Sequence, residues 1–128
     1  MTLCLERDLQ KFLSRNLQAI ERGLRAHPDY QLEEYPADTG RIDLLCQDAQ
    51  NNWVIIELKA GWAGDDAMGQ ILGYMGWVRH TLPNGSNLRG IIICKDATGR
   101  ARTAAKLVPG LSIKRFRLAF SIEDIDQP

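Results

Sequence analysis

The sequence predicts an α/β fold in which helices flank a mixed β-sheet, with the element order α-β-β-β-α-β-α-β. Three observations favour this class. Apolar residues recur at helical spacing near the N-terminus, strand-length apolar segments follow, and a second helical pattern lies between two of those segments. Turn-forming clusters such as PADTG and TLPNGSN separate the segments. An order with hairpins early and crossover connections late is typical of a mixed sheet covered by helices.

The first half of the chain should contain one long helix and a group of strands. The helix is expected over Leu5–Ala26, and Pro28 should end it. Tyr30–Tyr35 alternates weakly and suggests a short edge strand. Arg41–Asp48 and Trp53–Lys59 are apolar enough for central strands, and the short AQNN connection between them predicts a hairpin. The apolar stripe of the helix consists of Leu5, Leu9, Phe12, Leu13, Leu17, Ile20 and Leu24.

The second half should alternate helices with strands. A helix is expected over Asp66–Arg79, with an aspartate at position 65 or 66 capping its first amide groups. A β-branched strand follows over Leu88–Lys95, then a short helix over Arg100–Val108 and a final strand over Leu111–Phe120. The core stripe of the first of these helices consists of Met68, Ile71, Leu72, Met75 and Val78. Its glycines predict close packing of the helix on the sheet; they are Gly69, Gly73 and Gly76.

Composition places the chain among globular proteins. With 128 residues it should form a single domain over its whole length, with 45% hydrophobic and 25% charged residues. Three cysteines that lie far apart exclude a closed disulfide framework and a zinc site of the CxxC kind. No segment has the pattern of a signal peptide or of a membrane span. These observations predict a soluble protein of the reducing cytoplasm.

The charges are balanced in number but not in distribution. There are 16 basic and 16 acidic residues, so the formal net charge is zero. From Asp29 to Asp66, nine carboxylates face only two basic residues, whereas from Arg79 to Arg117 nine basic residues face only Asp96. Such asymmetry indicates contact with a polyanion, although ordinary solvated faces would give the same pattern.

Two acidic residues interrupt the apolar strands of the predicted hairpin. Because side chains alternate along a strand, Glu57 and Lys59 share one face of their strand, and Asp43 stands between apolar neighbours in the other. A lone buried carboxylate costs several kcal/mol unless it is neutralised, paired or bound to a metal. If both acids share a face, Asp43 must lie opposite Glu57 or Lys59.

This set of side chains permits two interpretations. A divalent cation with oxygen ligands would keep both acids ionised and polarise a phosphoryl group, while Lys59 orients an attacking water. Alternatively, Asp43, Glu57 and Lys59 form an ordinary buried ion triad. Spacing alone leaves the two open.

Longer stretches of the sequence carry a family resemblance. Asp43 followed by Glu57-Leu58-Lys59 resembles the PD-(D/E)XK nuclease signature. The stretches GRIDLL, NNWVIIELKAGWAGDDAMGQILGYMGWV, LRGIII and VPGLSIKRFRLAF together resemble the C-terminal nuclease domain of the NucS/EndoMS endonucleases, from Glu6 to about Phe120. The resemblance implies a restriction-endonuclease-like core. It also implies an Mg²⁺- or Mn²⁺-dependent DNA endonuclease that hydrolyses phosphodiester bonds in DNA repair or in processing mismatched, branched or single-stranded DNA.

The resemblance also assigns residue roles. Asp43 and Glu57 would be metal ligands, the backbone carbonyl of Leu58 would join them, and Lys59 would assist the attacking water. Gln70 and Tyr74 match a QxxxY motif that supports the site, and their spacing places them on one helical face. Glu6 matches an acidic position near the metal, although a solvated charge at a helix start fits it equally well.

Other features bear on how DNA would be bound. Members of this family carry an N-terminal domain for DNA binding and dimerisation; this chain is expected to be a stand-alone nuclease domain that acts with a homodimer or a separate partner protein. Ala60 stands where a basic residue is common in the family. Trp62 and Trp77 could stack on an unpaired base, although buried packing is favoured. The residues expected to contact phosphates are Arg41, Arg89, Arg100, Arg102, Lys106, Lys114, Arg115 and Arg117. The alternative function is a nuclease-fold module that binds DNA or protein without cleaving alone.

Overall fold

The computed structural model describes residues 5–38 and 40–126. Its elements are α1 (Leu5–Ser14), the 3₁₀ turn η1 (Leu17–Ala19), β1 (Arg25–Ala26), β2 (Glu33–Ala37), β3 (Gly40–Gln47), β4 (Trp53–Ala63), α2 (Asp65–Thr81), β5 (Leu88–Ala97), α3 (Gly99–Ala105) and β6 (Leu111–Arg115). The predicted α/β class is confirmed. Among the helices of these described ranges, none is long and apolar enough to cross a membrane.

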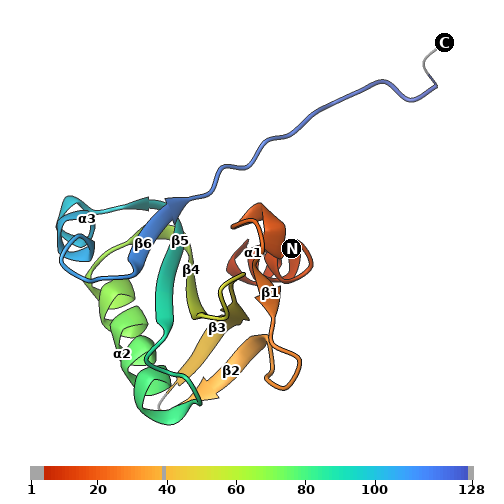
Figure 1. Cartoon of the computed structure of the whole chain (residues 1–128). Helices are drawn as coiled ribbons and strands as arrows, with labels where there is room; N and C mark the ends of the chain where they lie inside the picture. Colours follow the sequence, from red (N-terminus) through yellow and green to blue (C-terminus); the bar gives the residue numbers. More distant parts are fainter. Residues whose placement is uncertain (1–4, 39, 127–128) are drawn as a thin grey trace.

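The strands form one mixed sheet. Its order is β1-β3-β4-β5-β6, and β2 also pairs with β3. β3 and β4 are an antiparallel hairpin, whereas β5 and β6 run parallel to β4. In Figure 1 the sheet lies between α2 on one side and α1 on the other. The hairpin-then-crossover arrangement is the one that the element order predicts.

Both faces of the central strands are buried. Ile55 of β4 and Ile92 of β5 belong to the apolar cluster under α2, whereas the next residue of β4, Ile56, packs with Ile91 in the cluster under α1. Residues 53–58 of β4 are all buried. A polar side chain on this strand therefore lies between two apolar layers, as the sequence analysis expected for Glu57.

The first helix is shorter than predicted. It ends at Ser14 rather than at Ala26, because the side chain of Asn16 donates a hydrogen bond to the carbonyl oxygen of Phe12 (2.8 Å) and the chain continues into η1. Gly23 then adopts a φ of +86°, which a helix does not allow. Residues 25–26, expected to be helical, instead form β1 and pair with β3. The predicted order is therefore wrong here, because it lacks η1 and β1.

Other boundaries differ because tertiary pairing extends or ends the elements. β2 covers Glu33–Ala37 instead of residues 30–35, and α3 ends at Ala105 rather than at Val108. Pairing with β5 carries β4 on to Ala63, through part of the predicted loop. The last strand stops at residue 115; beyond it the chain runs away from the body, and Phe120 is 91% exposed (Figure 1).

Helix α2 departs from its prediction in several details. It begins at Asp65, one residue earlier, and no side chain caps its first amide groups, so the predicted aspartate cap is wrong. Leu72 is 40% exposed and does not belong to the core stripe. A Cβ added to Gly69, Gly73 or Gly76 would meet no atom within 4 Å. Close packing on the sheet therefore does not explain these glycines.

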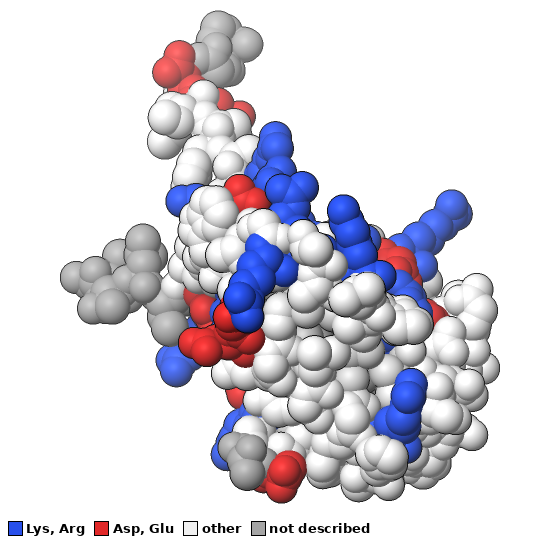
Figure 2. All heavy atoms as spheres, turned by 90° about the vertical axis from the view of Figure 1, so that its left-hand side faces the viewer, with Lys and Arg blue, Asp and Glu red and all other residues white. Residues whose placement is uncertain are grey.

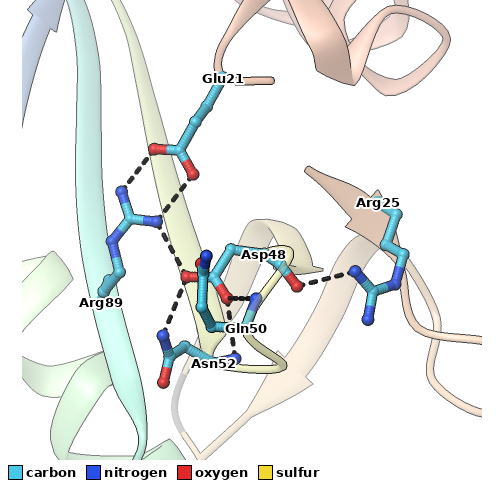
Figure 3. A network of polar contacts seen from close by, with 6 residues as sticks. All are labelled: Glu21, Arg25, Asp48, Gln50, Asn52 and Arg89. Atoms are coloured by element: carbon cyan, nitrogen blue, oxygen red, sulfur yellow. Dashed lines mark hydrogen bonds and ion pairs between the residues drawn. The ribbon is translucent and has the colours of Figure 1, made fainter. Parts of the chain in front are cut away.

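A buried aspartate shapes the connection between β3 and β4. Asp48 is 2% exposed, and its Oδ1 accepts hydrogen bonds from the backbone amides of Gln50 (3.0 Å) and Asn52 (2.9 Å). Its Oδ2 accepts from Nδ2 of Asn52 at 3.1 Å. These bonds fold the AQNN connection into a turn (Figure 3).

Arg89 completes this polar network. Its guanidinium donates to Asp48 Oδ2 at 3.0 Å and to Glu21 at 2.8 Å, and Figure 3 shows it between the two carboxylates. Burial alone would raise the pKa of Asp48, but hydrogen bonds from Asn52, Arg89 and Gln50 hold it below its usual value. Arg89 therefore links Glu21, in the segment after η1, to Asp48, in the β3–β4 connection. Because its guanidinium already binds two carboxylates, it is not free to bind a phosphate.

Asp48→Asn should lower the free energy of unfolding by about 1–3 kcal/mol. The new amide nitrogen cannot accept the two hydrogen bonds that Oδ2 now accepts, from Arg89 and from Nδ2 of Asn52. Urea denaturation measures the change. Glu21→Gln is the matched control and should cost less, since the Glu21 side chain is 27% exposed and keeps an acceptor oxygen. Equal stability of Asp48→Asn and wild type would contradict this role.

Candidate active site

Asp43 and Glu57 come together at the end of the β3–β4 pairing. The last paired residues are Leu44 and Ile56, and the same register places Asp43 opposite Glu57. Past the Leu44–Ile56 pair, the side chain of Asp43 bonds to the backbone of β4: its Oδ2 accepts a hydrogen bond of 2.7 Å from the amide of Leu58. The two acids therefore share one face, which the sequence predicted only as one of two possible registers.

Glu57 is a buried acid of the site whose carboxyl group is only partly hydrogen-bonded. It is 5% exposed, and its Oε2 has no hydrogen-bond partner within the described residues. Burial and then the charge of Asp43 raise the pKa of Glu57 to about 8. At neutral pH the carboxyl group is thus held largely protonated unless a cation joins it.

The pKa of Asp43 is also raised, but by less than that of Glu57. Burial raises the pKa of Asp43 to about 6, although the hydrogen bond from Leu58 acts in the opposite direction. The charges of Glu34 and Glu6 raise it further. Several carboxylates therefore repel one another at this point.

Lys59 provides the nearest positive charge. Its Nζ lies 3.7 Å from Oε1 of Glu57, beyond the length of a good hydrogen bond, and its side chain is 25% exposed. The ammonium therefore lowers the pKa of Glu57 only in part, and it remains able to reach into solvent. Such a long contact leaves Lys59 available to a ligand.

Helix α1 brings a further acid to the pair. Oε2 of Glu6 accepts a hydrogen bond of 3.1 Å from the amide of Ala60, immediately after Lys59. The charge of Glu6 raises the pKa of both Asp43 and Glu57. Glu6 therefore lies near the site, as the family resemblance implied.

Gln10 is a part of the site that the sequence analysis missed. Its side chain is 7% exposed, and its Nε2 donates to the backbone carbonyl of Asp43 (2.9 Å) and to Oε1 of Glu34 (3.1 Å). Glu34 itself has a φ of 54°, in the left-handed region. The available signal was the position of Gln10, three residues before Leu13 on the apolar stripe. Gln10 thus links α1 to the backbone of β3 at Asp43 itself.

A polar cleft of about 600 Å³ opens at Lys59, although neither Asp43 nor Glu57 lines it. Lys59, Gln70 and Tyr74 line it together, so three of the predicted site residues share one hollow. Gly69 and Gly73 also line it, and their missing side chains keep this side of α2 open. Gln70 and Tyr74 therefore lie with Lys59 in this cleft, and their predicted role in supporting the acids stays a prediction.

Tyr74 is held by a close contact with β3. A Cβ added to Gly40 would lie 2.4 Å from its hydroxyl oxygen, so a larger residue at this position would displace the Tyr74 ring. Burial and then the charge of Glu57 raise the pKa of Tyr74, whereas the backbone amide of Arg41 lowers it. The hydroxyl therefore remains protonated at neutral pH, close to both acids.

The donor set fits a hard divalent cation in part. In residues 5–38 and 40–126, no three His, Cys, Asp or Glu side chains come together as a metal cluster. Asp43 and Glu57 nevertheless offer oxygen atoms only, and the partnerless Oε2 of Glu57 is the kind of atom that a cation would satisfy. Two carboxylates, with the Leu58 carbonyl and water as further ligands, match the way Mg²⁺ is usually held in proteins.

Three of the eight residues expected to bind phosphates form ion pairs with acidic side chains of the protein. Arg89 is committed to Glu21 and Asp48, Arg100 pairs with Asp65 (3.1 Å), and Arg115 pairs with Asp96 (2.9 Å). The other five make no ion pair with the described part of the chain: Arg41, Arg102, Lys106, Lys114 and Arg117. In Figure 2, Lys and Arg gather in the upper half of the face that carries α2 and α3, mixed with fewer acids.

The two tryptophans considered for base stacking differ in environment. Trp77 is half-buried, and its ring lies 6.1 Å from the ring of Tyr35. Trp62 is 64% exposed, so the favoured expectation of buried packing is wrong for this residue. It stands three residues after Lys59 on β4.

Comparisons with known proteins identify the family of the chain. Residues 5–118 match the family model described as the endonuclease NucS C-terminal domain. Endonuclease NucS of Methanocaldococcus jannaschii is 30% identical over 101 residues, which cover 79% of this chain and 36% of that protein. Endonuclease NucS of Sulfolobus acidocaldarius is 28% identical over 119 residues, which cover 93% and 44%.

Solved structures show the same fold. A repair endonuclease from Pyrococcus abyssi superposes with a TM-score of 0.76 at 24% identity, covering 91% of this chain and 48% of that one. An EndoMS–dsDNA complex gives a TM-score of 0.78 at 24% identity, covering 94% and 49%. The chain thus spans less than half of the length of each of these relatives.

Proposed function

Because the chain belongs to the family of the endonuclease NucS C-terminal domain, we propose that it is the catalytic part of a DNA endonuclease that hydrolyses phosphodiester bonds with Mg²⁺ or Mn²⁺. The observation that carries the proposal is the state of Glu57. A buried carboxylate with a partnerless oxygen and a raised pKa, beside a second acid, is costly for the folded chain. Such sites are typical of function rather than of stability.

The residues of the site would have different roles in metal binding and in hydrolysis. Asp43 and Glu57 would hold the cation, together with the backbone carbonyl of Leu58, while Glu6 adds negative charge nearby. When bound, the cation would supply Lewis-acid polarisation of the scissile phosphodiester. Lys59 lies at the wall of the cleft, where its ammonium can orient an attacking water or donate a hydrogen bond to the developing negative charge.

Gln70 and Tyr74 would position the DNA backbone at the acids. Gln70 is exposed on the cleft side of α2, and its amide can donate to a phosphate oxygen. The Tyr74 hydroxyl stays protonated and can donate likewise, because burial and Glu57 raise its pKa. Arg41, at the start of β3, and the other unpaired basic residues would neutralise phosphates further along the strand.

We assign the activity to DNA repair or to the processing of mismatched, branched or single-stranded DNA. Support comes from the structural neighbours, one described as a repair endonuclease and one as an EndoMS complex with double-stranded DNA. We also propose that a second copy or a separate partner protein contributes to DNA binding, in line with the EndoMS neighbour that is described as a complex with double-stranded DNA.

Cleavage assays with the full chain test the proposal. Purified protein is incubated with single-stranded, duplex, branched and mismatched DNA, in Mg²⁺, in Mn²⁺ or in chelator. We expect cleavage of at least one substrate with a metal and none in chelator. Cleavage that persists in chelator would contradict the metal role. DNA binding without cleavage of any substrate would instead favour the module that needs a partner.

A further inference from the structure

The exposed tryptophan at the end of β4 is not explained by packing. Trp62 is 64% exposed, whereas Trp53 is 3% exposed and buried in an aromatic cluster with His27 and Tyr30. A single exposed apolar side chain is common in soluble proteins, so exposure alone decides nothing. The surroundings of the indole decide what it can bind.

Trp62 stands between two hollows of the surface. The first, of about 640 Å³, is shared with Lys59 of the candidate active site and with Arg100. The second, of about 770 Å³, is bordered by Lys95 and Arg117. Between Lys59 and Trp62 the pairing of β4 with β5 shifts its register, as it does at a β-bulge.

The charges of the second hollow favour an anionic ligand, whereas in the first hollow Asp65 and Asp66 balance Lys59 and Arg100. Lys95 and Arg117 make no ion pair within the described chain, and both lie beside the second hollow. Arg100 and Arg115 are paired with aspartates, so they contribute less. A flat aromatic face among free cations is the usual surface for a nucleic acid strand, because bases stack on the ring while phosphates meet the cations.

We propose that Trp62 stacks on an unpaired base of the DNA strand whose phosphate lies at Lys59; this rests on the proposed function. Lys59 and Trp62 are three residues apart, which is at most about 10 Å along a strand. A base at Trp62 therefore belongs to a nucleotide within about three positions of the cut. Because every base has a π-face, Trp62 selects an unstacked nucleotide rather than a sequence.

Binding of short oligonucleotides in chelator tests this inference. The probes are a fluorescein-labelled eight-nucleotide oligothymidine and an abasic strand of the same length and charge. Trp62→Ala should bind the oligothymidine about tenfold more weakly than wild type, with little change for the abasic strand. The affinity of Trp62→Phe for the oligothymidine should lie between those of wild type and Trp62→Ala. Leu107→Ala is the matched control, because Leu107 is 83% exposed and lies on neither hollow.

The outcomes separate this inference from the proposed function. An equal loss for both strands, or no loss in Trp62→Ala while wild type cleaves DNA with metal, would overturn base stacking and leave the nuclease proposal standing. If wild type binds neither strand nor cleaves any DNA, both fail. A melting temperature like that of wild type shows that Trp62→Ala still folds.

Discussion

Replacing Glu57 with glutamine should reduce the rate of metal-dependent DNA cleavage by about a thousandfold or more. Glutamine keeps the size of the side chain but removes the charge that would hold the cation beside Asp43. Asp43→Asn should lose a comparable factor, because Asp43, like Glu57, would supply a carboxylate oxygen to the cation. Single-turnover cleavage of the preferred DNA, at saturating Mn²⁺, measures the rate.

The control for this loss is Glu123→Gln. Glu123 lies on the exposed C-terminal segment, so the same chemical change there should leave cleavage unaltered. Lys59→Ala should be nearly as harmful as Glu57→Gln, because Lys59 is the one positively charged residue among the predicted catalytic residues. Cleavage that survives both Glu57→Gln and Lys59→Ala would mean that the site lies elsewhere or that a contaminant cuts the DNA.

The same substitution should stabilise the protein when no metal is present. Burial and Asp43 raise the pKa of Glu57 to about 8, so the folded state binds a proton that the unfolded state, with a value of 4.5, releases earlier. The contribution of Glu57 to the free energy of unfolding of wild type is therefore fully present below pH 4.5, and it is lost as the pH rises to about 8. Glu57→Gln has no such loss, and at pH 9 it should be more stable by about 3 kcal/mol.

Thermal melts in chelator between pH 5 and pH 9 measure this effect. The difference between Glu57→Gln and wild type should be small at pH 5 and reach about 10 °C at pH 9. Excess Mn²⁺ at pH 8 should raise the melting temperature of wild type and leave that of the variant unchanged. A variant that is less stable than wild type at pH 9 would support the alternative of a structural ion triad.

Much of the site could be predicted because it depends on local rules. Strand alternation placed Glu57 and Lys59 on one face, and the requirement that two acids share a face restricted the register to two choices. The structure selects the register with Asp43 opposite Glu57. The position of Gln70 and Tyr74 follows from helical spacing together with the family resemblance.

What could not be predicted depends on contacts distant in sequence. Gln10 bonds to Asp43, 33 residues away, and Arg89 reaches Glu21, 68 residues away. The apolar stripe after Ser14 continues at helical spacing, yet Leu17 and Ile20 reach the core from η1 and the turn after it. Hydrophobic spacing records burial, and it does not distinguish a helix from a turn that buries the same side chains.

Anomalous diffraction from crystals grown with Mn²⁺ would show whether Asp43 and Glu57 hold a metal ion. We expect one strong anomalous peak between β3 and β4, coordinated by a carboxylate oxygen of Asp43 and by Oε2 of Glu57, and no peak there in Glu57→Gln crystals. Crystals with full Mn²⁺ occupancy elsewhere, and with Glu57 bonded only to Lys59, would contradict this expectation.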